Sequence, residues 1–282
     1  MKLIRFGVAG NEKPGLIIGD KYVDVSSFVK DYTEDFFEQD GLKKLNDFLK
    51  TNPELPEINK NIRLGSPVAR PSKIVCIGLN YKDHAKETGA AIPTEPILFL
   101  KSTTALTGPN DNIIIPKNSQ KTDWEVELAV VIGSKASYVD EATALNYVAG
   151  YCLHNDVSER AFQLEMGGTW DKGKGCDSFA PMGPYLATPD ELEDVNNCRL
   201  WLTVNGQLMQ NGNTNNLIFN IPHLISYVSQ FMTLLPGDII STGTPAGVGL
   251  GMKPPVYLKP GDVVELGIDG LGISKQHVIA YK

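Results

Sequence analysis

The segment Asp123-Trp124-Glu125-Val126-Glu127-Leu128-Ala129-Val130-Val131 places acidic residues inside a run that is otherwise strongly apolar. The pattern predicts a β-strand. Side chains alternate between the two faces of a strand, so Glu125 and Glu127 point the same way, roughly 6.5–7 Å apart. Val126 and Leu128 point the other way and can pack in a core. The segment therefore predicts a sheet that carries a pair of carboxylates on one face.

A divalent cation is one explanation for carboxylates in such a strand. Burial of a charged carboxylate is costly unless a positive group compensates it, and carboxylate oxygens are ligands suited to magnesium, manganese or calcium. The alternative is an edge strand with one solvated face, which is the better explanation for an isolated Glu-x-Glu pair. A third acidic residue, Asp156, shifts the balance toward a metal site.

Asp156 follows the apolar run 150–153 at a point where a strand gives way to a helix. Arg160 and Gln163 lie four and seven residues later, about one and two turns along the same helix face. An acid, a cation and an amide on one face form a pocket for an anion and a metal. A helix-capping aspartate with a surface ion pair explains the spacing equally well.

The segment 78–87 (GLNYKDHAKE) contains a candidate general base. On a helix His84 and Glu87 are i,i+3 neighbours, close enough for a hydrogen bond. A carboxylate that fixes one imidazole nitrogen leaves the other free to take a proton from water. The alternative is a solvated, charged helix face. The sequence assigns structural roles to the remaining histidines, which are His154, His223 and His277.

Two glycine-rich loops carry groups that could bind an anion. The segment 170–179 contains Lys174, which could neutralise a substrate carboxylate or enolate, and it lacks the residue order of a nucleotide phosphate loop. The segment 241–249 follows an apolar strand, and its hydroxyls and amides suit an anionic oxygen. Ordinary surface loops are the alternative for both.

Short apolar runs separated by Gly, Pro, Asn and Asp dominate the chain after Pro71, which indicates many strands. The predicted strands are 74–77, 97–100, 113–115, 126–132, 147–153, 200–204, 238–241 and 263–268, with a hairpin at Asn205-Gly206. Only 83–88, 158–165 and 222–231 read as helices. Without βαβ alternation, the pattern predicts a mostly-β α+β catalytic domain rather than a doubly wound sheet.

Residues 1–65 are predicted to form a small N-terminal domain, and residues 70–282 the catalytic domain. The N-terminal part contains strand patterns at 3–9 and 16–25 and an amphipathic helix at 42–49. The segment Asn52-Pro53-Glu54-Leu55-Pro56 then forms a stiff connection that neither a helix nor a central strand tolerates well.

Composition excludes several classes of protein. The 282 residues are 42% hydrophobic and 21% charged, which is ordinary for a globular protein and excludes a disordered chain. No apolar stretch is long enough to span a bilayer. A net charge of −7 argues against nucleic acid or an anionic membrane as partner. The start lacks a signal-peptide pattern, and the four cysteines lack a CxxC pair, which favours a reduced, cytoplasmic protein.

Taken together, these segments resemble the fumarylacetoacetate hydrolase family from about Pro71 to the C-terminus. The matching elements are 78–87 (GLNYKDHAKE), 95–101 (EPILFLK), 125–127 (EVE), 156–163 (DVSERAFQ), Lys174, 242–249 (TGTPAGVG) and 260–262 (PGD). Their order and number make the match specific. The resemblance implies a catalytic domain with a mixed β-sandwich or roll, preceded by a small α/β domain.

The resemblance also implies a set of roles. A magnesium or manganese ion would be held by Glu125, Glu127 and Asp156, and a His84–Glu87 dyad on a mobile lid would activate water. Lys174 would act in catalysis, and Arg160, Gln163, Tyr81 and Thr242 would bind the 2-oxo-carboxylate end of a small-molecule substrate. Members are usually homodimers, sometimes tetramers.

Asn80-Tyr81 stands where the founding hydrolases carry an Asp-Tyr pair, which resembles the acylpyruvase-type branch. Within that branch, 158–163 (SERAFQ) and 170–175 (WDKGKG) resemble hydrolases of 2,4-diketo-3-deoxy sugar acids such as L-rhamnonate and L-fuconate. The expected reaction is a retro-Claisen hydrolysis to pyruvate and L-lactate. The alternatives are oxaloacetate decarboxylation, keto–enol tautomerisation, ureidoglycolate lyase activity and a non-catalytic domain with a structural calcium ion.

Overall fold

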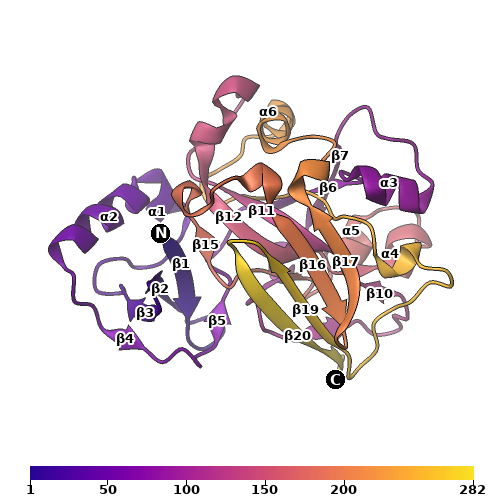
Figure 1. The fold of residues 1–282 in the computed structure, drawn as a ribbon, viewed down its shortest axis with the longest axis horizontal. Coiled ribbons are helices and arrows are strands. Elements are labelled where there is room, and N and C mark those ends of the chain that lie inside the picture. Colours follow the sequence, from indigo (N-terminus) through magenta and orange to yellow (C-terminus); the bar gives the residue numbers. More distant parts are fainter.

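The strands form two main sheets, and the computed structural model describes all of residues 1–282 (Figure 1). The larger sheet has the strand order β4 (Glu57–Ile58), β3 (Lys21–Asp24), β2 (Lys13–Ile18), β1 (Lys2–Phe6), β15 (Leu186–Ala187), β12 (Val148–Asn155), β11 (Val126–Ile132), β18 (Ile239–Ser241), β6 (Ile74–Gly78) and β7 (Ile97–Lys101), with β5 (Leu64–Gly65) beside β1. The second sheet has the order β17 (Gln207–Asn213), β16 (Arg199–Val204), β19 (Val263–Ile268), β20 (Gly272–Ala280) and β9 (Ile113–Ile115). Two short pairs lie apart from them, β8 (Leu106–Thr107) with β14 (Ala180–Pro181) and β10 (Thr122–Asp123) with β13 (Ser158–Glu159).

The helices are short and lie around the sheets. They are α1 (Glu34–Glu38), α2 (Gly41–Thr51), α3 (Lys82–Thr88), α4 (Arg160–Leu164), α5 (Asp171–Lys174) and α6 (Ile221–Phe231). Single 3₁₀ turns are η1 (Thr103–Ala105), η3 (Pro189–Glu191), η4 (Val195–Asn197), η5 (Thr214–Asn216) and η6 (Gly249–Gly251), and η2 (Glu141–Tyr147) is longer. None of these helices combines the length and apolarity needed to cross a membrane.

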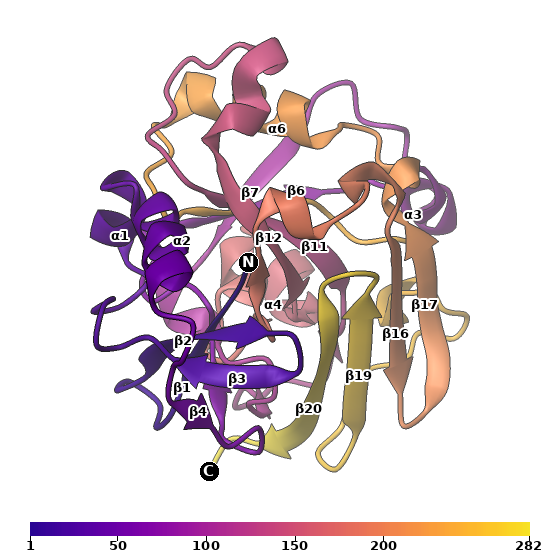
Figure 2. The same ribbon diagram turned by 60° about the vertical axis from the view of Figure 1, so that its left-hand side comes forward.

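Strand β11 is the central element of the larger sheet. All seven of its residues are buried, and it pairs antiparallel with β12 on one side and β18 on the other. Its ladder with β12 is regular from Val126↔Asn155 onward and is interrupted by a bulge only between Val131 and Ile132. The second sheet lies against it: the amide N of Val126 donates to Oε1 of Gln210 in β17. Figure 2 shows β20, β19, β16 and β17 side by side, with β11 and β12 behind them.

The N-terminal strands extend the larger sheet. β1 to β4 form an antiparallel meander, and β1 pairs with β15 through Lys2↔Ala187 and Leu3↔Leu186. One core of 55 buried residues runs from Leu3 in this meander through β11 to the second sheet. In Figure 1 this part lies at the left, away from α3, α4 and α5. The boundary between residues 65 and 70 stays a prediction.

The structure confirms the mostly-β α+β class and the absence of a doubly wound sheet. The strand at 126–132 has the predicted bounds, and Asn205-Gly206 forms the hairpin turn between β16 and β17, with φ of 51° and 79°. Three local predictions were wrong. The predicted helix at 158–165 begins only at Arg160, because Ser158 and Glu159 pair as β13 with β10. The pattern at 16–25 spans parts of β2 and β3, because the chain turns at Gly19, where φ is 56°. The glycine-lysine loop contains a short helix, α5, which carries Lys174.

Candidate active site

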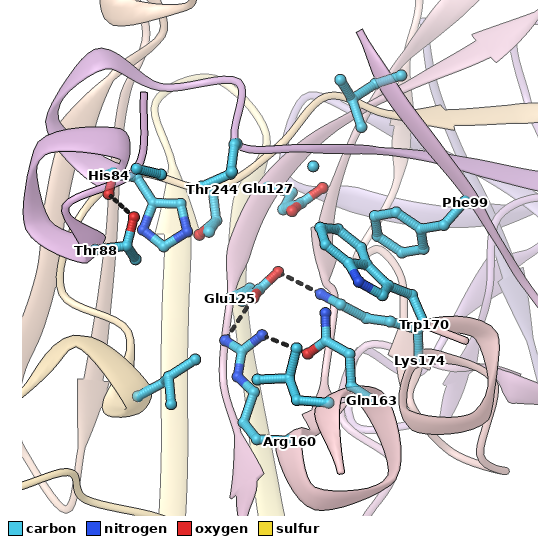
Figure 3. A pocket seen from close by; sticks show the side chains of 16 residues that line it. His84, Thr88, Phe99, Glu125, Glu127, Arg160, Gln163, Trp170, Lys174 and Thr244 are labelled. Carbon is cyan, nitrogen blue, oxygen red and sulfur yellow. Dashed lines mark hydrogen bonds and ion pairs between the residues drawn. The ribbon is translucent and has the colours of Figure 1, made fainter. Parts of the chain in front are cut away.

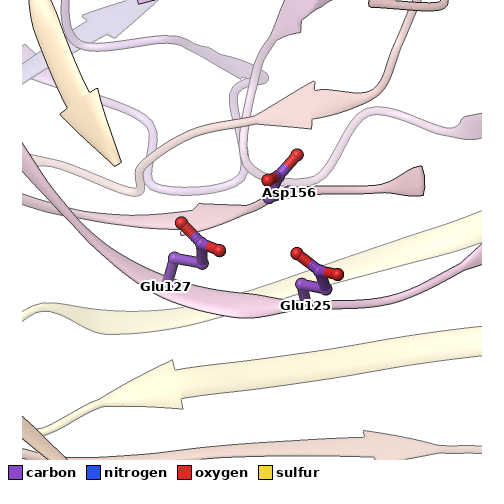
Figure 4. A group of neighbouring side chains, drawn as sticks. All are labelled: Glu125, Glu127 and Asp156. Carbon is purple, nitrogen blue, oxygen red and sulfur yellow. The ribbon is translucent and has the colours of Figure 1, made fainter. Parts of the chain in front are cut away.

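Three buried carboxylates lie at the adjoining ends of β11 and β12. Glu125 immediately precedes β11, Glu127 lies within it, and Asp156 immediately follows β12. The antiparallel register pairs Val126 with Asn155, and the amide N of Asp156 donates to the carbonyl O of Glu125 at 2.9 Å. One oxygen from each carboxylate lies within 4.8 Å of the other two (Figure 4). The three acids that the sequence separates by up to 31 residues therefore form one cluster.

Buried cations contact two of these carboxylates. Lys174 Nζ lies 2.7 Å from Glu125 Oε2 and 2.9 Å from Asp156 Oδ2, so it bridges them. Lys101 Nζ, at the end of β7, lies 2.5 Å from Asp156 Oδ1. Arg160 Nη2 lies 2.6 Å from Glu125 Oε1. Although burial opposes the effect, these cations hold the pKa values of Glu125 and Asp156 below their usual range.

Glu127 has no cationic partner. Its Oε2 accepts hydrogen bonds from the Ser241 hydroxyl at 2.5 Å and from the amide N of Gly243 at 3.0 Å. Burial, followed by the charges of Asp156 and Glu125, raises its pKa well above the ordinary value. The protein therefore disfavours the ionised form of Glu127, which is the one carboxylate of the cluster without a cationic partner.

The residues of the cluster fit a hard divalent cation. Its donors are carboxylate oxygens from three residues, which is the ligand type that magnesium and manganese prefer. Lys101, Arg160 and Lys174 contact Glu125 and Asp156, whereas no cation of the protein contacts Glu127. A bound cation would supply the positive partner that Glu127 lacks.

Arg160 and Gln163 lie on α4 beside the cluster. Asp156 does not share this helix as the spacing predicted, because Ser158 and Glu159 form β13 and α4 begins only at Arg160. Arg160 Nη1 donates to Gln163 Oε1 at 3.1 Å, and Arg160 Nε donates to Asp123 Oδ2 at 2.9 Å. Both residues line the cavity. The spacing from Asp156 therefore reflects a buried arrangement, and the alternative of a surface ion pair is excluded by the 5% exposure of Arg160.

His84 and Glu87 form a contact on α3, which follows β6. His84 Nδ1 lies 3.3 Å from Glu87 Oε2, and the other oxygen of this carboxylate accepts a hydrogen bond from the amide N of Gly247 at 2.9 Å. An Nδ1–H donated to the carboxylate leaves Nε2 as the proton acceptor. Figure 3 shows the imidazole on one side of the cavity, across from Lys174 and Trp170.

A cavity of about 200 Å³ lies beside these side chains, and neither Asp156 nor Glu87 is part of its lining. Polar residues line one part of it, namely His84, Thr88, Glu125, Glu127, Arg160, Gln163, Lys174 and Thr244. Carbon-rich side chains line the rest, namely Ile77, Leu79, Ala90, Phe99, Leu164, Trp170 and Leu250. The volume lies below the 300–1,000 Å³ that is typical of drug-sized ligands, so the cavity suits a small metabolite.

Two residues predicted to bind substrate lie outside the cavity lining. The Thr242 hydroxyl donates to the carbonyl O of Leu128 in β11, because the chain still runs beside that strand at this position. Thr244, two residues on, donates in the same way to the carbonyl O of Val126 at 3.0 Å, and it also lines the cavity. Tyr81 is fully buried next to α3, pairs with the backbone of Leu217 and has no hydrogen-bond partner for its hydroxyl.

Asn80 has a structural task in the same region. Its side-chain amide donates to the carbonyl O of Thr242 at 2.8 Å, and its Oδ1 accepts from the amide N of Phe219 at 2.8 Å. These bonds hold the segment around Phe219 against the loop after β18. The side chain is thus occupied by backbone groups.

The sequence did not single out Lys101, Asp123, Thr244 or Trp170 as site residues. A lysine that ends an apolar strand, as Lys101 does, is the one signal that could have found the second ammonium. His154, predicted to be structural, is buried behind the cluster, and its Nδ1 lies 2.7 Å from the Ser241 hydroxyl. Burial lowers its pKa to about 3, so its ring is neutral.

Comparison with known proteins identifies the family. The sequence model described as fumarylacetoacetate (FAA) hydrolase C-terminal matches residues 73–279. The chain belongs to the fumarylacetoacetate hydrolase family. A protein of Burkholderia multivorans that is named only in general terms as a hydrolase is 53% identical over 278 residues, 98% of each chain.

Two solved structures of the fumarylacetoacetate hydrolase family share the whole fold. Maleylpyruvate hydrolase from Sphingobium sp. SYK-6, solved with manganese(II) and pyruvate, is 29% identical, with a TM-score of 0.83 and full coverage of both chains. The 2-hydroxyhepta-2,4-diene-1,7-dioate isomerase from Mycobacterium marinum is 30% identical, with a TM-score of 0.76 and coverage of 99% and 98%. The family thus contains hydrolases and isomerases on one fold, and a divalent metal occurs in at least one member.

Proposed function

We propose that this protein is a metal-dependent hydrolase that cleaves the C3–C4 bond of a 2,4-dioxo acid and releases pyruvate. The observation that carries the proposal is a cluster of three carboxylates beside one small cavity, which Glu125, Glu127, Lys174 and His84 line, with Glu87 in contact with His84. The manganese and pyruvate in the Sphingobium maleylpyruvate hydrolase support the same end product and the same kind of ion.

Glu125, Glu127 and Asp156 would hold the ion, magnesium or manganese. When bound, such an ion supplies a Lewis acid next to the 2-oxo acid end of the substrate. Glu127 would gain most from the positive charge of the ion, because no cation of the protein contacts this carboxylate.

His84 is the proposed base. With Nδ1–H directed at Glu87, its Nε2 takes a proton from water while the water oxygen forms a bond to C4. The Glu87 carboxylate stabilises the imidazolium that results, because it lies 3.3 Å from Nδ1. The C3–C4 bond then breaks, its electron pair passes into the pyruvate enolate, and a proton completes C3.

Lys174 and Arg160 act on the charge that develops at the leaving group. The ammonium of Lys174 lies between two carboxylates and can donate to the enolate oxygen. Arg160 and Gln163 orient the carboxylate of the 2-oxo acid. These groups are fixed by buried contacts before the reaction, which is how preorganised charge lowers a barrier.

The finer proposal is that the substrate is a 2,4-diketo-3-deoxy sugar acid, such as that of L-rhamnonate or L-fuconate, cleaved to pyruvate and L-lactate. Arg160 and Lys174 are the only cations that line the cavity, and both are paired with buried carboxylates. A substrate tail with a second carboxylate would find no free cation. Leu164, Leu250 and Trp170 instead offer an apolar wall to a short uncharged tail.

The test uses purified protein loaded with magnesium or manganese, a 2,4-diketo-3-deoxy sugar acid, and water enriched in ¹⁸O. We expect equal amounts of pyruvate and lactate, with ¹⁸O in the lactate carboxylate. His84→Asn should lose turnover and keep metal binding, whereas His223→Asn should keep both, since His223 forms a similar pair with Glu141 at the surface. Absence of carbon–carbon cleavage with every 2,4-dioxo acid would refute the proposal.

Isomerisation is the second candidate, and the isomerase from Mycobacterium marinum favours it. It moves a proton within a 2-oxo acid and requires no attack by water. Conversion of a dienol acid without ¹⁸O incorporation, and with full activity in the His84→Asn variant, would support isomerisation over hydrolysis.

A further inference from the structure

The glycine-rich turn at 247–251 contacts both the cavity and the proposed His84–Glu87 pair. Residues 247–251 include η6 and pass beneath α3, where the amide N of Gly247 donates to Glu87 Oε1 at 2.9 Å. Leu250 in the same turn lines the cavity. The turn is therefore one of the two supports of the Glu87 carboxylate, and the other is the imidazole of His84.

The side chain of Asp123 holds this turn through hydrogen bonds to two of its backbone amides. It is fully buried, its Oδ1 accepts from the amide N of Gly249 at 2.7 Å, and its Oδ2 accepts from the amide N of Leu250 at 3.0 Å. The same Oδ2 accepts from Arg160 Nε at 2.9 Å. The neighbouring Trp124 adds a further tie, since its Nε1 donates to the carbonyl O of Gly247 at 3.1 Å.

The turn has room for a carboxylate on each side because two of its residues lack a side chain. A Cβ at Gly249 would lie 2.0 Å from the carbonyl O of Val256 and 2.8 Å from Asp123 Oδ1, and a Cβ at Gly251 would lie 2.5 Å from Glu87 Cδ. None of these distances is compatible with an ordinary contact. The backbone of this turn therefore lies between Asp123 and Glu87 and donates hydrogen bonds to both carboxylates.

We infer that Asp123 is a positioning residue, which sets Arg160 and the His84–Glu87 pair relative to each other through the turn at 247–251. The inference rests on the proposed role of His84 as the base. The guanidinium needs a fixed carboxylate behind it, and the base needs a fixed amide at Glu87. Asp123 contacts the Arg160 guanidinium directly. It also holds the amide N of Gly249, and the backbone of residues 247–249 connects this amide to the amide N of Gly247, which donates to Glu87.

The first test compares Asp123→Asn with Asp111→Asn. Asp111 is a matched control outside the cavity, because it also bridges an arginine and a turn: Arg63 Nη2 lies 2.6 Å from its Oδ2, which also accepts from the amide N of Gly108 at 2.8 Å. We expect Asp123→Asn to lower kcat by about 100-fold, as a displacement of about 1 Å in a reacting group does. Asp111→Asn should leave kcat unchanged.

A double-mutant cycle separates positioning from a loss of folded protein. In a Glu87→Ala background there is no carboxylate to position, so the further effect of Asp123→Asn on kcat should shrink to within about twofold. A general loss of folded enzyme would lower kcat equally in both backgrounds. An undiminished effect in the Glu87→Ala background would overturn the inference.

Gly251→Ala provides an independent variant should Asp123→Asn fold poorly. Its Cβ pushes directly on Glu87, so we expect a loss of kcat that Glu87→Asp, with a shorter side chain, partly restores. No rescue would count against the turn as the positioning element.

A measurement without turnover distinguishes failure of this inference from failure of the proposed function. Hydrogen–deuterium exchange of residues 82–88 in the manganese-loaded protein should become faster in Asp123→Asn and stay unchanged in Asp111→Asn. If the wild-type protein cleaves no 2,4-dioxo acid, the proposed function falls, and the exchange rates alone decide the role of Asp123. Unchanged exchange in Asp123→Asn would overturn it.

Discussion

Glu125 lies just before β11 and Glu127 lies within it, yet the same Glu→Gln substitution should lower the stability of the metal-free protein only at Glu125. Glu125 contacts two cations, Arg160 Nη2 at 2.6 Å and Lys174 Nζ at 2.7 Å. Glu125→Gln removes the anion from between them and leaves two buried cations with fewer partners. Breaking a buried pair in this way costs about 3–5 kcal/mol.

Glu127→Gln replaces a buried carboxyl group that no cation contacts and whose ionised form burial already disfavours. An amide oxygen can still accept from the Ser241 hydroxyl and the amide N of Gly243, which now contact Oε2. Repulsion from Glu125 and Asp156 disappears at the same time. We therefore expect the metal-free variant to be at least as stable as the wild type.

The assay is thermal unfolding in EDTA and then in excess magnesium or manganese. In EDTA, Glu125→Gln should lower Tm by about 6–10 °C, taking roughly 2 °C per kcal/mol for a chain of this size, and Glu127→Gln should not lower it. In excess metal the wild type should gain about 2.7 kcal/mol at 100 times the Kd, and both variants should gain less. Glu265→Gln, in a surface pair with Lys275 on the second sheet, is the control and should change little. Equal losses for the two site variants in EDTA would refute the assignment of Glu127 as the uncompensated donor.

Three further outcomes are expected. Lys101→Met should destabilise the metal-free protein by about 3–5 kcal/mol, measured by urea unfolding, because Asp156 loses a fully buried partner; a loss within 0.5 kcal/mol would contradict this. For Glu12, burial raises the pKa but the hydrogen bond from Arg63 and the charges of Arg5 and Arg63 outweigh it, so the folded pKa is below 4.5. Glu12→Gln should therefore be less stable than the wild type at pH 7, and the gap should close as the pH falls below 4.5; a gap that widens in acid would be inconsistent with this sign. Finally, 2,4-dioxoheptanoate should be cleaved at least about 10-fold more efficiently, by kcat/KM, than 2,4-dioxoheptanedioate, since an unpaired charge is costly to bury; equal rates would show that the cavity does provide a cation for the tail.

The sequence predicted the elements of the site better than their mutual register. The alternation in 123–131 gave β11 its bounds, and it put Glu125 and Glu127 on one face because that follows from strand geometry alone. The spacing from Arg160 to Gln163 likewise follows from a helix, but Asp156 lies outside that helix, because β13 separates it from α4. Convergence of the two strand ends depends on the pairing of Val126 with Asn155, which no local pattern encodes.

The residues that were missed or misplaced depend on long-range pairing. Thr242 and Thr244 are chemically identical, and both hydroxyls donate to carbonyl oxygens of β11, yet only Thr244 lines the cavity. No local sequence pattern distinguishes the two. Asp123 has the same residue type as a metal ligand, but the turn at 247–251 and Arg160 occupy its oxygens. Lys101 meets Asp156 across 55 residues of sequence, a contact that composition and periodicity do not report.

The bulge between Val131 and Ile132 lies at the opposite end of the β11–β12 ladder from the carboxylates. A bulge absorbs an extra residue by a local bend, so it separates the connection at 133–147 from the regular pairing near Asn155. Relatives or engineered variants can therefore lengthen or shorten that connection without sliding one ligand-bearing strand along the other. No bulge lies near Glu125 or Asp156, so an insertion or deletion there would shift the pairing of β11 with β12. A shift of one residue would turn the acidic side chains toward the interior of the sandwich.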